Sequence, residues 1–285
     1  MFREATSPAC TARVARPEEL EQVRLLVSWS EHAHLRFQLE YLPQLVGEGH
    51  ILAIGQGEQL SGIAYVTLDY PNSSIRGLVV RSSRETAQVV QATLNYALPA
   101  ARALGALSLN YIGDDAWLTP HLTRAGFSYA GQIIGLNRPG AFMTARGNTA
   151  CEVRPADEHD LPSLVAIDWS AFEPLWRNGS ETTASFLEQM PCFLLASVNG
   201  QPLGYICGSA HARTGHIVRL AVRQDVRRHG IGTRLMHDAL AWLSQRGVRS
   251  LSLNTQAENS QSQAFYRALG FYRVQSPSSV YRYLF

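Results

Sequence analysis

An internal repeat limits the architecture of this 285-residue chain more than any other feature of its sequence. Segments of the first half recur in the second half at an offset of about 140 residues: 16–20 with 154–158, 52–65 with 195–205, 77–80 with 219–222, and 125–127 with 269–271. The second of these pairs reads as a β-hairpin with a glycine-containing turn in both copies. A repeat of this length predicts two copies of one α/β domain.

The repeat also predicts the boundaries of the domains. We expect a first domain at residues 1–138 and a second domain at residues 151–285. Residues 139–150 contain glycine, asparagine and threonine without a hydrophobic period, which is typical of a linker.

The second copy has the clearer pattern of helices and strands. We expect its central helix at residues 231–246, where apolar residues recur at helical spacing. Shorter helices are expected around 164–168 and 260–269, and strands at 193–198, 203–210, 216–222, 250–255 and 280–285. The expected fold class is α/β, with a mixed and mostly antiparallel sheet flanked by helices in each domain.

Residues 219–235 carry the strongest chemical signal in the chain. A short apolar strand leads into a turn with Arg227, Arg228, Gly230 and Gly232, and an amphipathic helix follows. Glycine lets a ligand approach the backbone, a helix start favours an anion, and arginine forks onto phosphate. The run therefore predicts a pyrophosphate cradle. It is not a P-loop, because no Gly-Lys-Ser/Thr follows, and it lacks two glycines of the dinucleotide fingerprint.

The run instead resembles the Arg/Gln-x-x-Gly-x-Gly/Ala signature of the GNAT superfamily, the acyl-CoA-dependent N-acyltransferases. Arg227, Gly230 and Gly232 fill its fixed places. Residues 251–271 resemble the second hallmark of that family, which is a strand, Asn259, a short helix with Tyr266, and Leu-Gly-Phe. The resemblance covers about residues 151–285. The alternative is an ordinary glycine-containing loop with a solvated basic edge.

The two copies differ at the positions that carry this resemblance. Arg227, Gly230 and Gly232 correspond to Glu85, Gln88 and Val90, and Asn259 and Tyr266 correspond to Asp115 and Leu122. A carboxylate repels phosphate, and side chains in place of glycine keep a ligand away from the backbone. We therefore expect a degenerate first domain that kept only the fold, and an active second domain.

The resemblance implies an N-acetyltransferase that moves an acetyl group from acetyl-CoA to a primary amine. The implied cofactor-binding residues are Leu220, Ala221, Val222, Arg227, Arg228, His229, Gly230, Ile231, Gly232, Thr233, Asn259 and Tyr266. Tyr266 would also protonate the departing thiolate, and a strand N–H near Val222 would donate to the oxyanion. Two alternatives stay open: Asn259 as a helix N-cap, and Tyr266 as a core aromatic residue.

The family does not fix the position of the general base. His216 is the first candidate, because imidazole titrates near neutral pH, and Glu173 in a loop before the first strand is the second. The weaker candidates are His211, Asp168 and Glu258, and the aromatic residues expected near the acceptor are Phe172 and Trp176. For each candidate base, a purely structural role is the alternative.

Composition and charge exclude several classes of function. A net charge of +2 gives no basis for a nucleic-acid partner. No apolar stretch suits a membrane span or a signal peptide, and the 4 cysteines lack ligand spacing, so we expect no metal and a cytoplasmic location. The expected partner is an amine substrate, either a small molecule or a peptide, and the expected state is a monomer or homodimer. The alternative function is a non-catalytic acyl-CoA sensor or pseudoenzyme.

Overall fold

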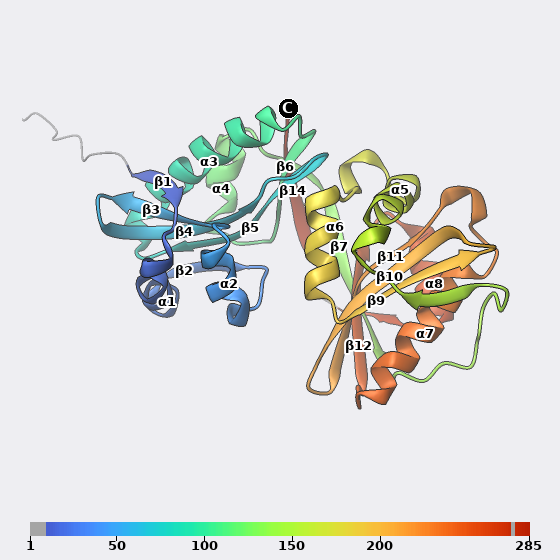
Figure 1. Ribbon diagram of the computed structural model, residues 1–285. Helices are drawn as coiled ribbons and strands as arrows, with labels where there is room; N and C mark the ends of the chain where they lie inside the picture. Colours follow the sequence, from blue (N-terminus) through green and yellow to red (C-terminus); the bar gives the residue numbers. More distant parts are fainter. Residues whose placement is uncertain (1–9, 275–276) are drawn as a thin grey trace, which may run out of the picture. The chain divides into compact units, whose positions relative to one another are not determined.

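The structure, a computed structural model, describes residues 10–274 and 277–285, which divide into two compact units. Unit 1 contains the chain up to Ala130 together with Val280–Phe285, and unit 2 contains Gly131–Ser279. In Figure 1 unit 1 is drawn in blue to green together with the red β14, and unit 2 runs from green through yellow to red. No helix in the described ranges has both the length and the apolar character needed to cross a membrane.

Unit 1 is built on one mixed sheet with the strand order β1-β3-β4-β5-β6-β14, and β2 is an additional partner of β5. Its strands are β1 (Thr11–Val14), β2 (His32–Leu35), β3 (Ile51–Gln56), β4 (Gln59–Thr67), β5 (Asn72–Val80), β6 (Ser108–Ile112) and β14 (Ser278–Leu284). Its helices are α1 (Leu20–Trp29), α2 (Leu42–Gly47), α3 (Thr86–Ala103) and α4 (Thr119–Arg124). Among the strand pairs that described residues form in this sheet, β5–β6 is parallel and the others are antiparallel.

Side chains alternate between the two faces of a sheet along each strand, and both faces of this sheet carry apolar side chains. Helices therefore cover both faces. On β5, Leu78 belongs to the core that α3 helps to form, whereas Val79 belongs to the core formed with α1 and α2.

Unit 2 repeats this plan with the strand order β7-β12-β11-β10-β9-β8. Its strands are β7 (Ser128–Pro139), β8 (Glu152–Pro155), β9 (Cys192–Val198), β10 (Gln201–His211), β11 (Thr214–Val222), β12 (Ser250–Gln256) and β13 (Tyr272–Arg273). Its helices are α5 (Leu161–Ala171), α6 (Ser180–Gln189), α7 (Ile231–Gln245) and α8 (Ser260–Ala268). Residues of α7 and α8 pack in one core and residues of α5 in the other. The predicted fold class is confirmed.

The last strand of each copy pairs outside the copy that precedes it. β14, which the sequence placed at the end of the second domain, pairs with β6, so that Val280 lies opposite Ile112. From Gly131 onward β7 belongs to unit 2 and pairs with β12, where Ile134 lies opposite Thr255. In Figure 1 the red β14 accordingly lies beside β6. Alternating apolar residues predict a strand but do not reveal which neighbour it joins. The domain boundaries at residues 1–138 and 151–285 therefore stay a prediction from the repeat in the sequence.

Candidate active site

The central strand of unit 2 parts from one neighbour halfway along its length. β11 and β12 pair in parallel only over Thr214–Ile217 and Ser250–Leu253. Beyond these residues β12 stays paired with β7, and β11 stays paired with β10. After Ile217, the edge of β11 that faced β12 therefore has no neighbouring strand among the described residues.

Backbone groups of two predicted cofactor-binding residues face this open edge. The N–H of Arg223 donates to the carbonyl of Leu203 at the end next to β10, with a distance of 2.9 Å. Residues of a strand alternate in the direction of their N–H and C=O groups. The groups of Leu220 and Val222 therefore point toward the side that β12 has left, whereas those of Ala221 face β10.

The turn after β11 forms a concave row of backbone donors. Arg228 and Gly230 both have left-handed backbone conformations, with φ of 68° and 77°. Within the described part of the chain, the N–H groups of Arg228 through Thr233 donate to no acceptor. Successive free N–H groups around left-handed residues form an anion-binding nest, and the N-terminus of α7 adds a positive partial charge.

The two glycines of this turn serve different needs. The φ of Gly230 lies in the left-handed region, which residues with a Cβ adopt only with strain, so the backbone of the turn favours glycine at this position. At Gly232, by contrast, φ is ordinary, and a Cβ would meet its nearest atom, Cζ of Phe265, at 3.5 Å, which is normal contact. Packing within the described chain therefore does not demand glycine at 232, whereas the close approach of a ligand to the backbone would.

Tyr266 has features of both a core residue and a proton donor. Its ring packs edge-on against Phe265 and Phe271, with centroids 5.2 and 5.7 Å away, and the residue is 8% exposed. Its hydroxyl makes no hydrogen bond to any described residue. Burial raises the pKa of Tyr266 to about 12, against the opposing charge of Arg219. The phenol is therefore protonated at neutral pH.

Asn259 caps α8, which was one of the two roles considered for it. Its Oδ1 accepts a hydrogen bond from the N–H of Ser262 at 2.9 Å, and its Nδ2 donates to Gln256 at 3.4 Å. The cap fixes the start of the helix that carries Tyr266.

Residues 161–271, which contain the parted strands, the donor turn and Tyr266, match the family model described as acetyltransferase (GNAT) family. Over these residues the chain is similar to the GNAT superfamily. The resemblance predicted from the two motifs is thereby confirmed.

Curated relatives agree with this similarity, and a solved structure shares the fold. An uncharacterized N-acetyltransferase of Methanocaldococcus jannaschii is 28% identical over 42% of this chain and 76% of its own length. The [Ribosomal protein bS18]-alanine N-acetyltransferase of Escherichia coli is 28% identical over 39% of this chain and 74% of its own. A tandem GNAT protein from the clavulanic acid biosynthesis pathway has the same fold over 96% of this chain and 98% of its own, with a TM-score of 0.61 at 13% identity. The predicted tandem arrangement is confirmed.

The candidate bases of the GNAT domain lie in different surroundings. His216 is half-buried, and its Nδ1 lies 2.8 Å from Oγ of Ser252, where β11 and β12 are still paired. Glu173 is exposed at the N-terminus of the short 3-10 helix Pro174–Trp176. His211 and Glu258 are also exposed.

Asp168 is bonded on every side in a buried network that the sequence did not reveal. Arg219 of β11 donates to both of its carboxylate oxygens, at 2.8 and 2.9 Å, and the hydroxyl of Tyr205 donates to it at 2.6 Å. Asp168 also accepts from the N–H of Asn178, and Arg219 donates to the carbonyl of Trp176. The network ties the segment after α5 to the central strand, and a carboxylate so engaged is a poor base.

Phe172 belongs to the same region, since the Arg219 guanidinium lies 3.6 Å from the centre of its ring. The Arg227 guanidinium donates to the carbonyl of Ala171, whereas Arg228 is exposed beside the donor turn. Of the two arginines predicted to assist the pyrophosphate, only Arg228 thus has a side chain turned to solvent.

A short strap, Gly147 and Asn148, supports the donor turn from the predicted linker. The N–H of Asn148 donates to the carbonyl of Gly230 at 3.1 Å, and its side-chain amide donates to the carbonyl of His229 at 3.0 Å. Gly147 has φ of 66°, and a Cβ there would lie 2.3 Å from the N atom of Arg234. Sequence reasoning missed this strap, because a Gly-Asn pair is also typical of an ordinary loop.

In unit 1 the chain itself fills the corresponding positions. β2 pairs with Gly77–Val80 of β5, along the edge that is open on β11. Just before β2, the Glu31 carboxylate accepts a hydrogen bond from the N–H of Ser83 at 2.7 Å, in the turn that precedes α3. This hydrogen bond is the main cause that lowers the pKa of Glu31. In unit 1, β2 thus occupies the strand edge that is open on β11 of unit 2, and the Glu31 carboxylate occupies a position equivalent to the donor turn.

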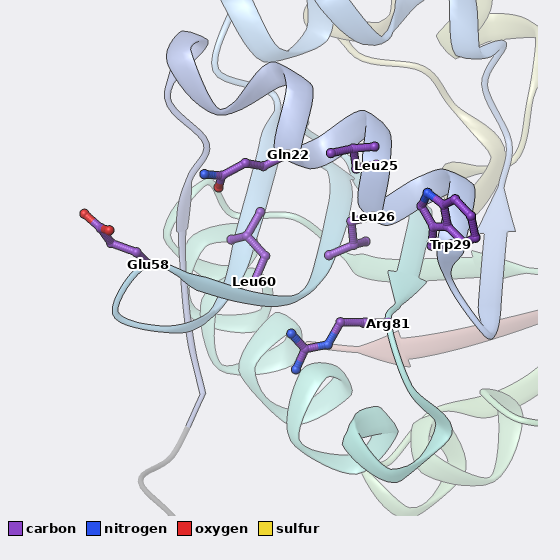
Figure 2. Close-up of a pocket in the computed structure, with 7 residues that line it drawn as sticks. All are labelled: Gln22, Leu25, Leu26, Trp29, Glu58, Leu60 and Arg81. Atoms are coloured by element: carbon purple, nitrogen blue, oxygen red, sulfur yellow. The ribbon is translucent and has the colours of Figure 1, made fainter.

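An apolar groove of unit 1 lies apart from these features. It has a volume of about 360 Å³ between α1 and the start of β4 (Figure 2). Its walls are Leu25, Leu26, Trp29 and Leu60, with Gln22, Glu58 and Arg81 beside them. The groove contains no cluster of groups suited to acyl transfer.

Proposed function

We propose that the protein is an acetyl-CoA-dependent N-acetyltransferase whose cofactor binds to unit 2. The observation that carries this proposal is the row of free N–H groups from Arg228 to Thr233 at the start of α7. These groups fit a pyrophosphate, and the exposed Arg228 adds a positive charge. The open edge of β11 would pair with the pantetheine arm through Leu220 and Val222 in the manner of an added strand.

The same elements support the chemistry of acetyl transfer. A neutral amine attacks the thioester carbonyl, and the N–H of Val222 on the open edge would stabilise the oxyanion. The departing thiolate takes a proton, for which the unpartnered phenol of Tyr266 is the proposed donor. His216 and Glu173 remain the candidate bases that remove the proton of the amine. His229, Ile231, Gly232 and Thr233 would bind the cofactor through the backbone, and Asn259 by holding α8 in place.

The acceptor is proposed as a primary amine of a small molecule or a peptide. Because one curated relative acts on an alanine of ribosomal protein bS18, peptides with an N-terminal alanine are the first acceptors to assay. The second candidate function is an acyl-CoA sensor without turnover. Thiol release in the presence of an amine library would separate the two functions, since a sensor binds acetyl-CoA and releases none.

We propose that only unit 2 binds the cofactor, because β2 and Glu31 fill the corresponding positions in unit 1. Calorimetric titration of the full chain with acetyl-CoA should therefore give one site per chain. Two sites would contradict the inequality of the copies, and no binding would contradict the acetyltransferase proposal. An Arg227→Ala/Arg228→Ala variant that binds acetyl-CoA as tightly as the wild type would remove the arginines from the cradle.

The strap provides a separate test of the donor turn. Gly147→Ala should weaken acetyl-CoA binding about tenfold, because the new Cβ would displace Arg234 and Gly230 from their positions. Gly140→Ala is the matched control: Gly140 has a similar φ of 69°, but a Cβ there meets nothing within 4 Å. Equal affinities of the two variants in the same titration would show that the strap does not position the turn.

A further inference from the structure

Two arginines of unit 1 lie side by side on neighbouring strands. The N–H of Arg36, just after β2, donates to the carbonyl of Arg76 on β5 at 2.8 Å, which extends the ladder beyond the Leu35–Gly77 pair. Residues that face each other across two strands have neighbouring side chains, and like charges in such a pair are destabilising. We call Arg36 and Arg76 the arginine pair.

No carboxylate of the described residues compensates the arginine pair. Among the residues that the structure describes, neither guanidinium has an acidic partner within 4.0 Å, and the Arg36 side chain donates only to the carbonyl of Ile112 at 3.5 Å. The Nε of Arg76 is enclosed and has no hydrogen-bond partner in that part of the chain. Asp115 is already bound to Nδ1 of His34 at 2.8 Å and to the hydroxyl of Tyr111 at 2.6 Å.

The arginine pair destabilises the fold unless a group of negative charge binds to it. Burial lowers the pKa of Arg36 and of Arg76, and the charge of Arg76 lowers that of Arg36 further. Half-buried positive charges without a counter-charge destabilise a fold. An enclosed donor without an acceptor adds to the cost.

The arginine pair also has a defined place in the fold. β5 pairs with β6 up to Ile75 and with β2 from Gly77 onward, so Arg76 stands where the strand changes partner. In unit 2 the corresponding point is the parting of β11 and β12 after Ile217. Nε2 of His34, two residues before Arg36, is a second enclosed atom without a partner among the described residues.

We propose that the arginine pair of unit 1 binds a small oxyanion, a carboxylate or a phosphate group of a ligand, at the point where β5 changes its partner. Two guanidinium groups offer forked donors that match the oxygens of either group. Unit 1 thereby has a binding role of its own, although β2 fills the edge on which a pantetheine arm would lie. This site is independent of the cofactor site proposed for unit 2.

Thermal unfolding of the full chain tests the site with inorganic phosphate and, separately, with acetate, each compared with chloride at equal ionic strength. We expect at least one of the two anions to raise the Tm of the wild type, with the stronger one identifying the preferred group. Arg36→Gln and Arg76→Gln should each lose most of this rise. Phosphate bound at the turn of unit 2 would raise the Tm of these variants as much as that of the wild type, so only the difference between proteins counts.

The controls keep the outcome decisive. Arg24→Gln, at an exposed arginine of α1 that pairs with Glu21 at 3.2 Å, should keep the full rise. Arg36 follows β2 and is not part of the long strand β5, so its replacement should disturb the sheet less than that of Arg76. Arg36→Gln therefore supplies the test if Arg76→Gln does not fold. The absence of a rise with both anions overturns the proposal, as does a rise of equal size in Arg36→Gln and the wild type.

Discussion

Replacing Tyr266 with phenylalanine is expected to lower kcat by about 10² to 10⁴-fold while the affinity for acetyl-CoA stays unchanged. The phenol has no hydrogen bond to the described residues, and its ring packs between Phe265 and Phe271, so the change removes only the hydroxyl. Because burial raises the pKa of Tyr266 to about 12, the wild-type phenol stays protonated at ordinary assay pH. Stopped assays of thiol release and calorimetric titration measure the two quantities.

Tyr272→Phe is the matched control for this change. Tyr272 lies on β13 of the same unit and is 57% exposed, so its hydroxyl should not affect turnover or stability. Undiminished turnover of Tyr266→Phe would leave Tyr266 as a core aromatic residue only. Weaker binding without a change in kcat would instead place its hydroxyl on the cofactor.

The fold and the donor turn were predictable because they depend on local patterns. Gly230, which has a left-handed φ, and the apolar period of α7 mark a turn and a helix within one continuous stretch of sequence. Tyr266 and Asn259 were proposed from the resemblance of residues 251–271 to a family motif, which is also a local pattern.

Features that depend on distant residues could not be predicted from these patterns. The bond between Asn148 and Gly230 joins positions far apart in sequence, and the exchange of β7 and β14 depends on which edge each strand joins. The same holds for β2, because the four residues His32–Leu35 are too few for their alternation of polar and apolar side chains to identify a strand. The repeat relates residues 77–80 of its partner β5 to the expected strand 216–222, but only the ladder shows that β2 fills the free edge of β5.

Disrupting the buried network around Asp168 should have the largest effect on stability. Asp168→Ala is expected to lower the free energy of unfolding by about 3–5 kcal/mol, because it leaves the Arg219 guanidinium buried without its bidentate partner. Tyr205 would lose its acceptor in the same variant, and Asn178 would lose the bond that fixes the segment after α5. Denaturant unfolding followed by tryptophan fluorescence measures the loss.

An exposed ion pair provides the comparison for this prediction. Asp225 accepts from Arg223 at 2.7 Å with a similar bidentate geometry, but its side chain is 58% exposed. Asp225→Ala should therefore leave the free energy of unfolding almost unchanged, since solvent screens such a pair. Asp168 bonds to the segment that carries Phe172 and Trp176, the aromatic residues expected near the acceptor, and makes no bond to the described residues of the donor turn. Asp168→Ala should therefore raise KM for the amine more than the dissociation constant for acetyl-CoA. A loss below about 1 kcal/mol for Asp168→Ala would contradict the role of the buried network in holding this segment to β11.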